Sequence, residues 1–125
     1  MNRVSKSLRL VGAVAAAAGL MLSSSTALAQ GKIKIGLMLP YTGTYAALGT
    51  AITNAFKLAI DEQGGKLGGR EIEYFTVDDE SDPAKAPDNA NKLIKRDQVD
   101  VLVGTVHSGV ALAMSWVARG NNALL

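Results

Sequence analysis

The hydrophobic residues of this chain gather in three strand-like stretches, each followed by a segment with helical spacing. In the first stretch, residues 32–39, isoleucine and leucine occupy alternate positions and the last three residues are all apolar. Alternation with a continuous apolar end predicts a strand covered on both faces. Pro40 ends it because proline cannot donate to a ladder. The other two strands are predicted at residues 70–77 and 99–106.

Three helices are predicted after these strands, from apolar residues three and four positions apart. The first spans residues 45–63 and ends at two glycines. The second follows an Asp82-Pro83 start, begins at about Pro87 and runs to about Asp97, with Leu93 and Ile94 facing inward. The third spans residues 110–119. The predicted apolar faces are Leu48, Ile52, Ala55, Phe56, Ala59 and Ile60 in the first helix, and Leu112, Ala113, Trp116 and Val117 in the third.

The order of these elements predicts an α/β fold, a doubly wound parallel sheet with flanking helices. Strands alternate with helices through short loops, which implies parallel strands joined by right-handed crossovers. Residues 121–125 have the pattern of a turn and the opening of a fourth strand. In such a sheet the first strand lies between the second and third. Ligands are then expected at the carboxyl edge between strands one and three.

Residues 1–29 have the pattern of a cleaved signal peptide. Arg3, Lys6 and Arg9 precede an apolar run over residues 10–22, and Ala27-Leu28-Ala29 forms an A-x-A cleavage site. The alternative is a membrane anchor, but the run is shorter than the roughly 20 residues that a span needs. We therefore expect cleavage after Ala29 and a periplasmic location. Residues 30–125 are expected to be a fragment that stops inside an element.

Removal of that segment changes the charge of the chain. The sequence has 13 basic and 11 acidic residues, a net charge of +2, but three of the basic residues lie in the predicted signal. The remainder has 10 basic and 11 acidic residues, a net charge of −1. This balance gives no support for a nucleic-acid partner. The chain has no cysteine, so it has neither a disulfide framework nor a lipid-acceptor cysteine after the signal.

Two loops are expected to face each other at the carboxyl edge, residues 40–49 and 104–109. Ser108 can bind a carboxylate together with free N–H groups at the start of its helix, or it can merely cap that helix. Gly109 leaves room for a ligand. His107 either donates to a ligand or is an ordinary surface residue. Tyr41 and Tyr45 either line a pocket or cover the edge of the sheet.

Other chemistry finds no support in the sequence. Residues 43–49 lack the end of a phosphate-binding loop, and no dinucleotide fingerprint follows a strand. The acidic run 78–82 does not match a calcium loop and is interpreted as a solvated helix start. One histidine without cysteine makes a zinc site improbable, and no nucleophile has a base at a recognisable spacing. We therefore expect no cofactor, no metal and no enzymatic activity.

Several segments together resemble periplasmic substrate-binding proteins of the branched-chain amino acid type. They are residues 32–43 (KIKIGLMLPYTG), 59–65 (AIDEQGG), 67–70 (LGGR), the acidic pair 78–79 with 82–86 (DPAKA), and 103–109 (VGTVHSG). The resemblance implies a type I two-lobed binding protein that closes around a small ligand and delivers it to the permease of an ABC importer. It also implies that residues 30–125 are the N-terminal, truncated part of the first ligand-binding lobe.

The resemblance also implies roles for particular residues. Ser108 matches the family serine that binds the ligand's carboxylate. Leu48 stands where amino-acid binders often carry a pocket tyrosine. The ligands of such relatives include leucine-type amino acids, amides, urea and aromatic carboxylates. We expect a small carboxylate, without a choice between an amino acid and an aromatic acid, and an amide or urea is the alternative. A ligand-sensing regulator shares the fold, and a phospho-acceptor domain or enzyme is the remaining alternative class.

Overall fold

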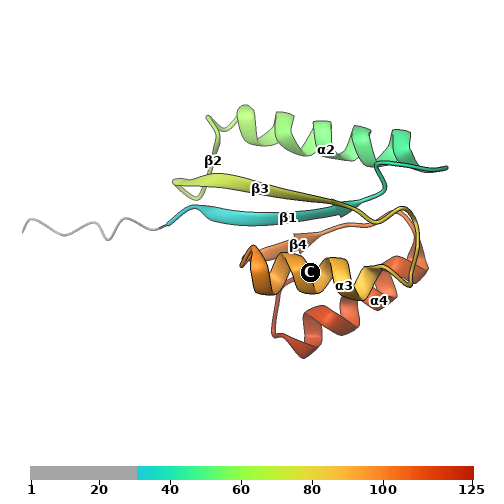
Figure 1. Cartoon of the computed structure of the whole chain (residues 1–125). Coiled ribbons are helices and arrows are strands. Elements are labelled where there is room, and N and C mark those ends of the chain that lie inside the picture. The colour runs from blue at the N-terminus through green and yellow to red at the C-terminus, as the bar shows by residue number, and fades with distance from the viewer. Residues whose placement is uncertain (1–30) are drawn as a thin grey trace, which may run out of the picture. The chain divides into compact units, whose positions relative to one another are not determined.

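The computed structural model describes residues 31–125, in which a sheet lies between two layers of helices (Figure 1). The predicted signal peptide lies outside the described residues. The predicted alternation of strands and helices is confirmed. In chain order the elements are β1 (Ile33–Leu39), α2 (Ala46–Asp61), β2 (Lys66–Leu67), β3 (Arg70–Asp78), α3 (Ala86–Asn91), the π-helical turn η1 (Lys92–Arg96), β4 (Val101–Val103) and α4 (Ser108–Gly120).

The four-stranded sheet has the order β2-β3-β1-β4. β1 pairs in parallel with β3 on one side and with β4 on the other. The predicted position of the first strand between the next two is therefore confirmed. The short β2 was not predicted. It pairs antiparallel with β3 through a turn of two glycines with positive φ, Gly68 and Gly69, so the sheet is mixed rather than purely parallel.

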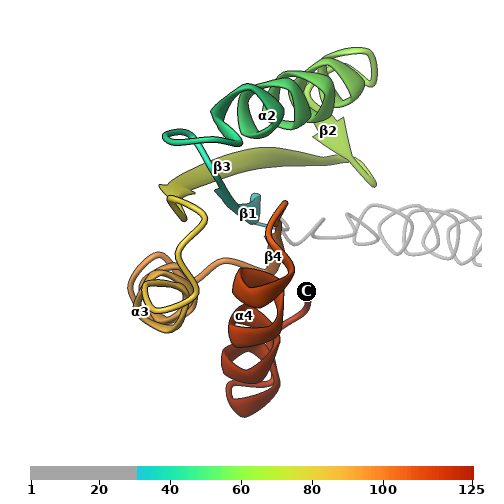
Figure 2. The same ribbon diagram turned by 90° about the vertical axis from the view of Figure 1, so that its right-hand side faces the viewer.

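α2 covers one face of the sheet (Figure 2). Ile35, Leu37 and Leu39 occupy alternate positions of β1 and are buried on this face. The ring of Phe56 from α2 meets the ring of Tyr74 from β3 edge to face, with centroids 6.0 Å apart. Aromatic rings prefer this geometry because the positive edge of one meets the negative face of the other.

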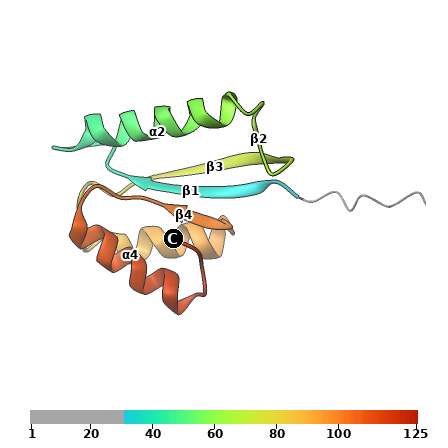
Figure 3. The same ribbon diagram turned by 180° about the vertical axis from the view of Figure 1, so that it is seen from behind.

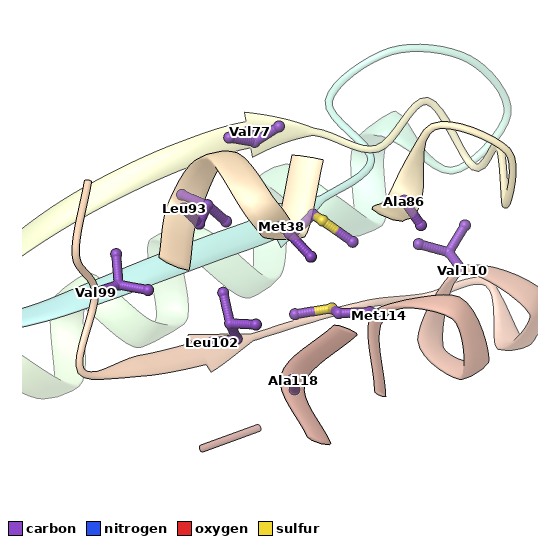
Figure 4. Close-up of a cluster of buried hydrophobic side chains, with 10 residues drawn as sticks. Met38, Val77, Ala86, Leu93, Val99, Leu102, Val110, Met114 and Ala118 are labelled. Atoms are coloured by element: carbon purple, nitrogen blue, oxygen red, sulfur yellow. The ribbon is translucent and has the colours of Figure 1, made fainter. Parts of the chain in front are cut away.

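α3, η1 and α4 cover the opposite face. Figure 4 shows the buried side chains there, which come from the three parallel strands β1, β3 and β4 and from these helices. Residues of β3 alternate between the two faces, since Val77 and Phe75 lie with this cluster and Ile72 and Tyr74 with the other. The cluster comprises Met38, Val77, Ala86, Ala90, Leu93, Val99, Leu102, Val110, Met114 and Ala118.

The buried row of α2 differs from the predicted one. Gly49, Thr53 and Ile60 are buried, whereas Leu48 and Ile52 are 50% and 40% exposed. The first two of these buried residues are small, so a hydrophobicity pattern does not identify them. This side of α2 faces the sheet because Gly49 lies directly against the backbone of Pro40 at the end of β1.

The predicted apolar face of the last helix is wrong for its two largest side chains. Leu112 and Trp116 are 54% and 64% exposed. α4 instead buries Val110, Met114 and Ala118, which are four residues apart and so lie on one side of the helix. Because α4 carries apolar residues on most of its sides, spacing alone does not select the side that packs.

Element boundaries also differ from prediction by up to three residues. β4 ends at Val103, three residues earlier than expected, and residues 104–107 form the loop into α4. Gly104 begins this loop, where a Cβ atom would lie 2.0 Å from the carbonyl oxygen of Met38. α3 begins at Ala86, one residue before the predicted start, and the helical segment ends as η1. Leu93 is buried and Ile94 half-buried, as predicted.

The end of the chain returns to the sheet beside β4 (Figure 3). Leu124 forms a parallel bridge with Val101, and its carbonyl oxygen accepts a hydrogen bond from the N–H of Leu102 at 2.9 Å. This pairing agrees with the fourth strand predicted to open within residues 121–125.

Candidate functional site

The candidate site lies at the carboxyl edge of the sheet. β1, β3 and β4 are parallel, so the loops that leave them emerge at the same edge. Residues 40–45 connect β1 to α2, residues 79–85 connect β3 to α3, and residues 104–107 connect β4 to α4. The predicted site residues all lie on the first and third of these connections or in the first turns of the helices that follow them.

His107 caps α4. It has extended backbone angles, φ −86° and ψ 122°, and its Nδ1 accepts a hydrogen bond from the N–H of Gly109 at 3.1 Å. This bond satisfies one of the N–H groups that the first turn of a helix leaves free. The bond requires an unprotonated Nδ1, so the proton of the neutral imidazole lies on Nε2. The capping role that the sequence analysis considered for Ser108 therefore belongs to His107.

Ser108 is the first residue of α4 and is exposed. The first hydrogen bond of the helix runs from the N–H of Ala111 to the carbonyl of His107. The N–H groups of Ser108 and Val110 consequently have no partner within the helix. Val110 is fully buried, so the hydroxyl and the N–H of Ser108 are the donors presented at the positive end of the helix dipole, where an anion is favoured.

Gly109 has a packing role in addition to the access predicted for it. A Cβ atom at this position would lie 2.9 Å from Cγ of Pro83 and 3.0 Å from Cε1 of His107. Pro83 belongs to the loop after β3, so the start of α4 packs tightly on that loop. A larger residue at position 109 would separate the two or displace the His107 ring.

Tyr41 lies beneath α2. Its side chain is half-buried with the apolar residues on that face of the sheet. Its Oη lies 2.9 Å from Oγ1 of Thr53, which itself donates to the carbonyl of Gly49 at 2.9 Å. Because the threonine hydroxyl has one hydrogen, Tyr41 is the donor of the pair. The Tyr41 hydroxyl is therefore engaged in joining the loop to the helix.

Tyr45 and Leu48 lie at the start of α2. Tyr45 occupies the N-cap position without a capping bond from its side chain, and its exposed fraction is 38%. Leu48 is in the first turn and is 50% exposed. Both side chains are apolar surface close to the carboxyl edge, where they remain free to contact a ligand.

Asp78 organises the loop after β1, a role that the sequence analysis did not find. Its Oδ1 accepts from the N–H of Tyr41 at 2.8 Å, and its Oδ2 accepts from the Thr42 hydroxyl at 2.6 Å. Burial acts to raise the pKa of Asp78. The hydrogen bonds from Thr42, Tyr41 and Glu80 outweigh it, so the pKa lies below its ordinary value.

Asp79 corrects the interpretation of the acidic run as solvated. It is fully buried, its Oδ1 accepts from the N–H of Ser81 at 2.7 Å, and its Oδ2 accepts from the hydroxyl of Thr105 in the loop after β4. Asp82 is the residue of the run that behaves as a local cap, since its Oδ1 accepts from the N–H of Ala84 at 2.9 Å. Two aspartates directly after a strand that ends at a ligand edge were the available sequence signal.

Within residues 31–125, no group of three or more histidine or acidic side chains is placed to hold a metal ion. Among the same residues, no helix has both the length and the apolar character needed to cross a bilayer.

The periplasmic binding protein family matches residues 32–125. The chain belongs to this family. The Leu/Ile/Val-binding protein BraC3 of Rhizobium johnstonii is 38% identical over 101 residues, which cover 78% of this chain and 27% of that protein. Relatives of this kind are substrate-binding proteins, not enzymes. They are extracytoplasmic and work with ABC transporters.

Two solved structures share the fold of this chain. One is the solute-binding protein of an ABC transporter from R. palustris in complex with benzoate, with 57% identity and a TM-score of 0.71 over 73% of this chain and 25% of that one. The other, from Rhodopseudomonas palustris BisB5 in complex with 3,4-dihydroxybenzoic acid, has 35% identity and a TM-score of 0.70 over 74% and 25%. The chain thus spans about a quarter of the length of these relatives and matches their N-terminal lobe.

Proposed function

We propose that this chain forms the ligand-binding edge of the first lobe of a solute-binding protein that delivers a small carboxylate to the permease of an ABC importer. The observation that carries the proposal is the position of Ser108, exposed at the start of α4 beside the loop after β1. Its hydroxyl and its N–H offer donors to one carboxylate. Because the matched part of the chain covers only about a quarter of the relatives' length, a second lobe would supply the remaining contacts.

An aromatic carboxylate such as benzoate is the first candidate ligand. Its support is the 57% identity with a protein crystallised with benzoate. The exposed side chains of Tyr45 and Leu48 suit a flat apolar ring. Residues 40–49 and 104–109 contain no acidic residue, so these loops offer no negatively charged partner to an ammonium group.

A branched-chain amino acid is the second candidate. It is favoured by the 38% identity with a Leu/Ile/Val-binding protein. This ligand would use the same carboxylate contact at Ser108, and its ammonium would need an acidic group outside these two loops. The two candidate ligands therefore differ in whether they carry an ammonium group and in the shape of their apolar part. Both would use the part of the site described above.

We further propose that the chain is exported and that it binds its ligand without changing it chemically. Residues 1–29 would direct the chain to the periplasm, with cleavage after Ala29, and the ligand would be released unchanged to the permease. Mass spectrometry of the protein from a periplasmic extract tests the cleavage. A mature chain that begins at Gln30 is expected, and retention of residues 1–29 in a membrane fraction would contradict it.

Calorimetric titration of the two-lobed protein tests the ligand. Benzoate, leucine and isoleucine are titrated into wild type, Ser108→Ala and Ser115→Ala. Loss of a hydrogen bond to a charged group costs about 1.5–3 kcal/mol, so Ser108→Ala should weaken binding about 10- to 100-fold. Ser115 is the matched control, because it lies in the same helix and its hydroxyl donates only to the carbonyl of Leu112. Equal affinity of wild type and Ser108→Ala would refute the carboxylate contact.

A further inference from the structure

Two adjacent carboxylates at the end of β3 hold the two loops of the candidate site. Asp78 accepts hydrogen bonds from the N–H of Tyr41 and the hydroxyl of Thr42, both in the loop after β1. Asp79 accepts from the hydroxyl of Thr105, in the loop after β4. One dipeptide is therefore bonded to both of the segments that carry the predicted ligand contacts.

The alternation of side chains along β3 explains how neighbours reach opposite loops. Successive side chains of a strand point to opposite faces of the sheet. Asp78 follows Ile72 and Tyr74 on the face covered by α2, and Asp79 follows Phe75 and Val77 on the face covered by α3 and α4. Backbone pairing places the dipeptide at the edge, because Asp78 lies opposite Leu39 and the N–H of Asp79 donates to the Leu39 carbonyl at 3.1 Å.

Burial of Asp79 is costly and has no cationic compensation. Within residues 31–125, no lysine, arginine or histidine forms a salt bridge with either carboxylate of the pair. A buried carboxyl group without an opposite charge must recover its hydration from hydrogen bonds alone. Both oxygens of Asp79 accept such bonds, and the bond from Thr105 joins Asp79 to the loop after β4. This bond suits a role in positioning that loop.

Thr105 is close enough to the start of α4 to set its position. Only Val106 and the capping His107 separate it from Ser108. On its other side Gly104 is held against the carbonyl oxygen of Met38. The loop is thus fixed to β1 at one residue and to Asp79 at the next, and α4 begins three residues later.

We propose that Asp78 and Asp79 are positioning residues, which hold the loops after β1 and β4 so that the hydroxyl and the N–H of Ser108 meet the ligand's carboxylate. Asp79 acts through Thr105 on the start of α4, and Asp78 acts on Tyr41 and Thr42. The proposal rests on the proposed function, because the ligand loops are those assigned there.

The test compares variants of Thr105 and Asp79 in the two-lobed protein, by titration with benzoate and by thermal unfolding without ligand. Thr105→Val removes the hydroxyl at nearly constant volume and should weaken binding at least about tenfold, whereas Thr105→Ser keeps the hydroxyl and should restore most of the affinity. Asp79→Asn cannot accept both of the native bonds. Adding Thr105→Val to it should cause little further loss, since residues in one network are not additive.

Asp100→Asn is the matched control. The Asp100 carboxylate accepts from the backbone N–H of Lys34 at 2.8 Å, near the opposite end of β1. This variant should lower the melting temperature without changing the affinity. The proposal would be overturned if Thr105→Val bound benzoate like wild type, or if Thr105→Ser lost as much affinity as Thr105→Val.

A second readout separates this proposal from the proposed function. The amide NMR shifts of Ser108 and Gly109 in the unliganded protein report the position of the α4 start directly. Thr105→Val should move both and Asp100→Asn should move neither. If wild type bound none of the carboxylates, the proposed function would fail, and unchanged Ser108 and Gly109 shifts in Thr105→Val would still overturn the positioning role.

Discussion

Gly49 of α2 lies against the carbonyl oxygen of Pro40, at a point where a Cβ atom would be 1.8 Å from that oxygen. No side chain fits such a distance, so glycine is required for the helix to pack on the end of β1. This contact determines how closely α2 packs on the sheet. It also brings Thr53 to the Tyr41 hydroxyl one turn later.

Gly49→Ala should therefore destabilise the protein. The added methyl group must push α2 away from β1, and overpacking of this kind costs about 1–3 kcal/mol or more. Gly120→Ala is the matched control, because Gly120 also lies in a helix and a Cβ atom there would meet nothing within 4 Å. Urea unfolding measures both variants. A Gly49→Ala protein as stable as Gly120→Ala would contradict the close contact.

The capping role of His107 predicts different effects for two substitutions. His107→Ala removes the acceptor of the Gly109 N–H and should cost about 1 kcal/mol of stability. His107→Asn should retain most of the stability, because asparagine is among the best N-cap residues. The free energy of unfolding distinguishes them. If the asparagine variant kept its stability and lost ligand affinity, the imidazole Nε2 would also contact the ligand.

The buried row of α4 predicts unequal effects within one helix. Met114→Ala should cost about 2–5 kcal/mol, because Met114 is fully buried in the cluster shown in Figure 4. Leu112→Ala should change stability by no more than about 0.5 kcal/mol, since more than half of that side chain is exposed. Equal losses in the two variants would place Leu112 in the core.

The hydrogen bonds to the Asp78 carboxylate predict that the free energy of unfolding depends on pH. Its pKa is lower in the folded protein than in the unfolded chain, because Thr42 and the backbone N–H groups hydrogen-bond the ionised form. Its contribution is complete above the unfolded pKa of about 3.9 and is lost as the pH falls through the lower folded value. Asp78→Asn should therefore destabilise the protein at neutral pH, and the difference from wild type should shrink below about pH 4. Thermal unfolding from pH 3 to 7 measures this difference, and a constant difference would contradict it.

Much of the fold was predictable from local sequence patterns. Period-two alternation identified β1 and, less regularly, β3, an apolar run of mostly β-branched residues identified β4, and helical spacing identified the segments between them. The central place of β1 follows from the doubly wound topology, in which the chain runs one way from the first strand to the second and the other way to the third. The same reasoning placed residues 107–109 at the carboxyl edge, because a strand followed at once by a helix leaves its loop there.

Features that depend on contacts between distant residues required the tertiary structure. Met114 rather than Trp116 is buried because α4 meets residues of β1 and α3, and the apolar character of α4 on most sides is compatible with several orientations. Asp79 is buried because Thr105, 26 residues further along the chain, lies beside it once β3 and β4 flank β1. Local patterns report periodicity and turn chemistry, whereas the partner of a buried polar group is determined only when the strands have assembled.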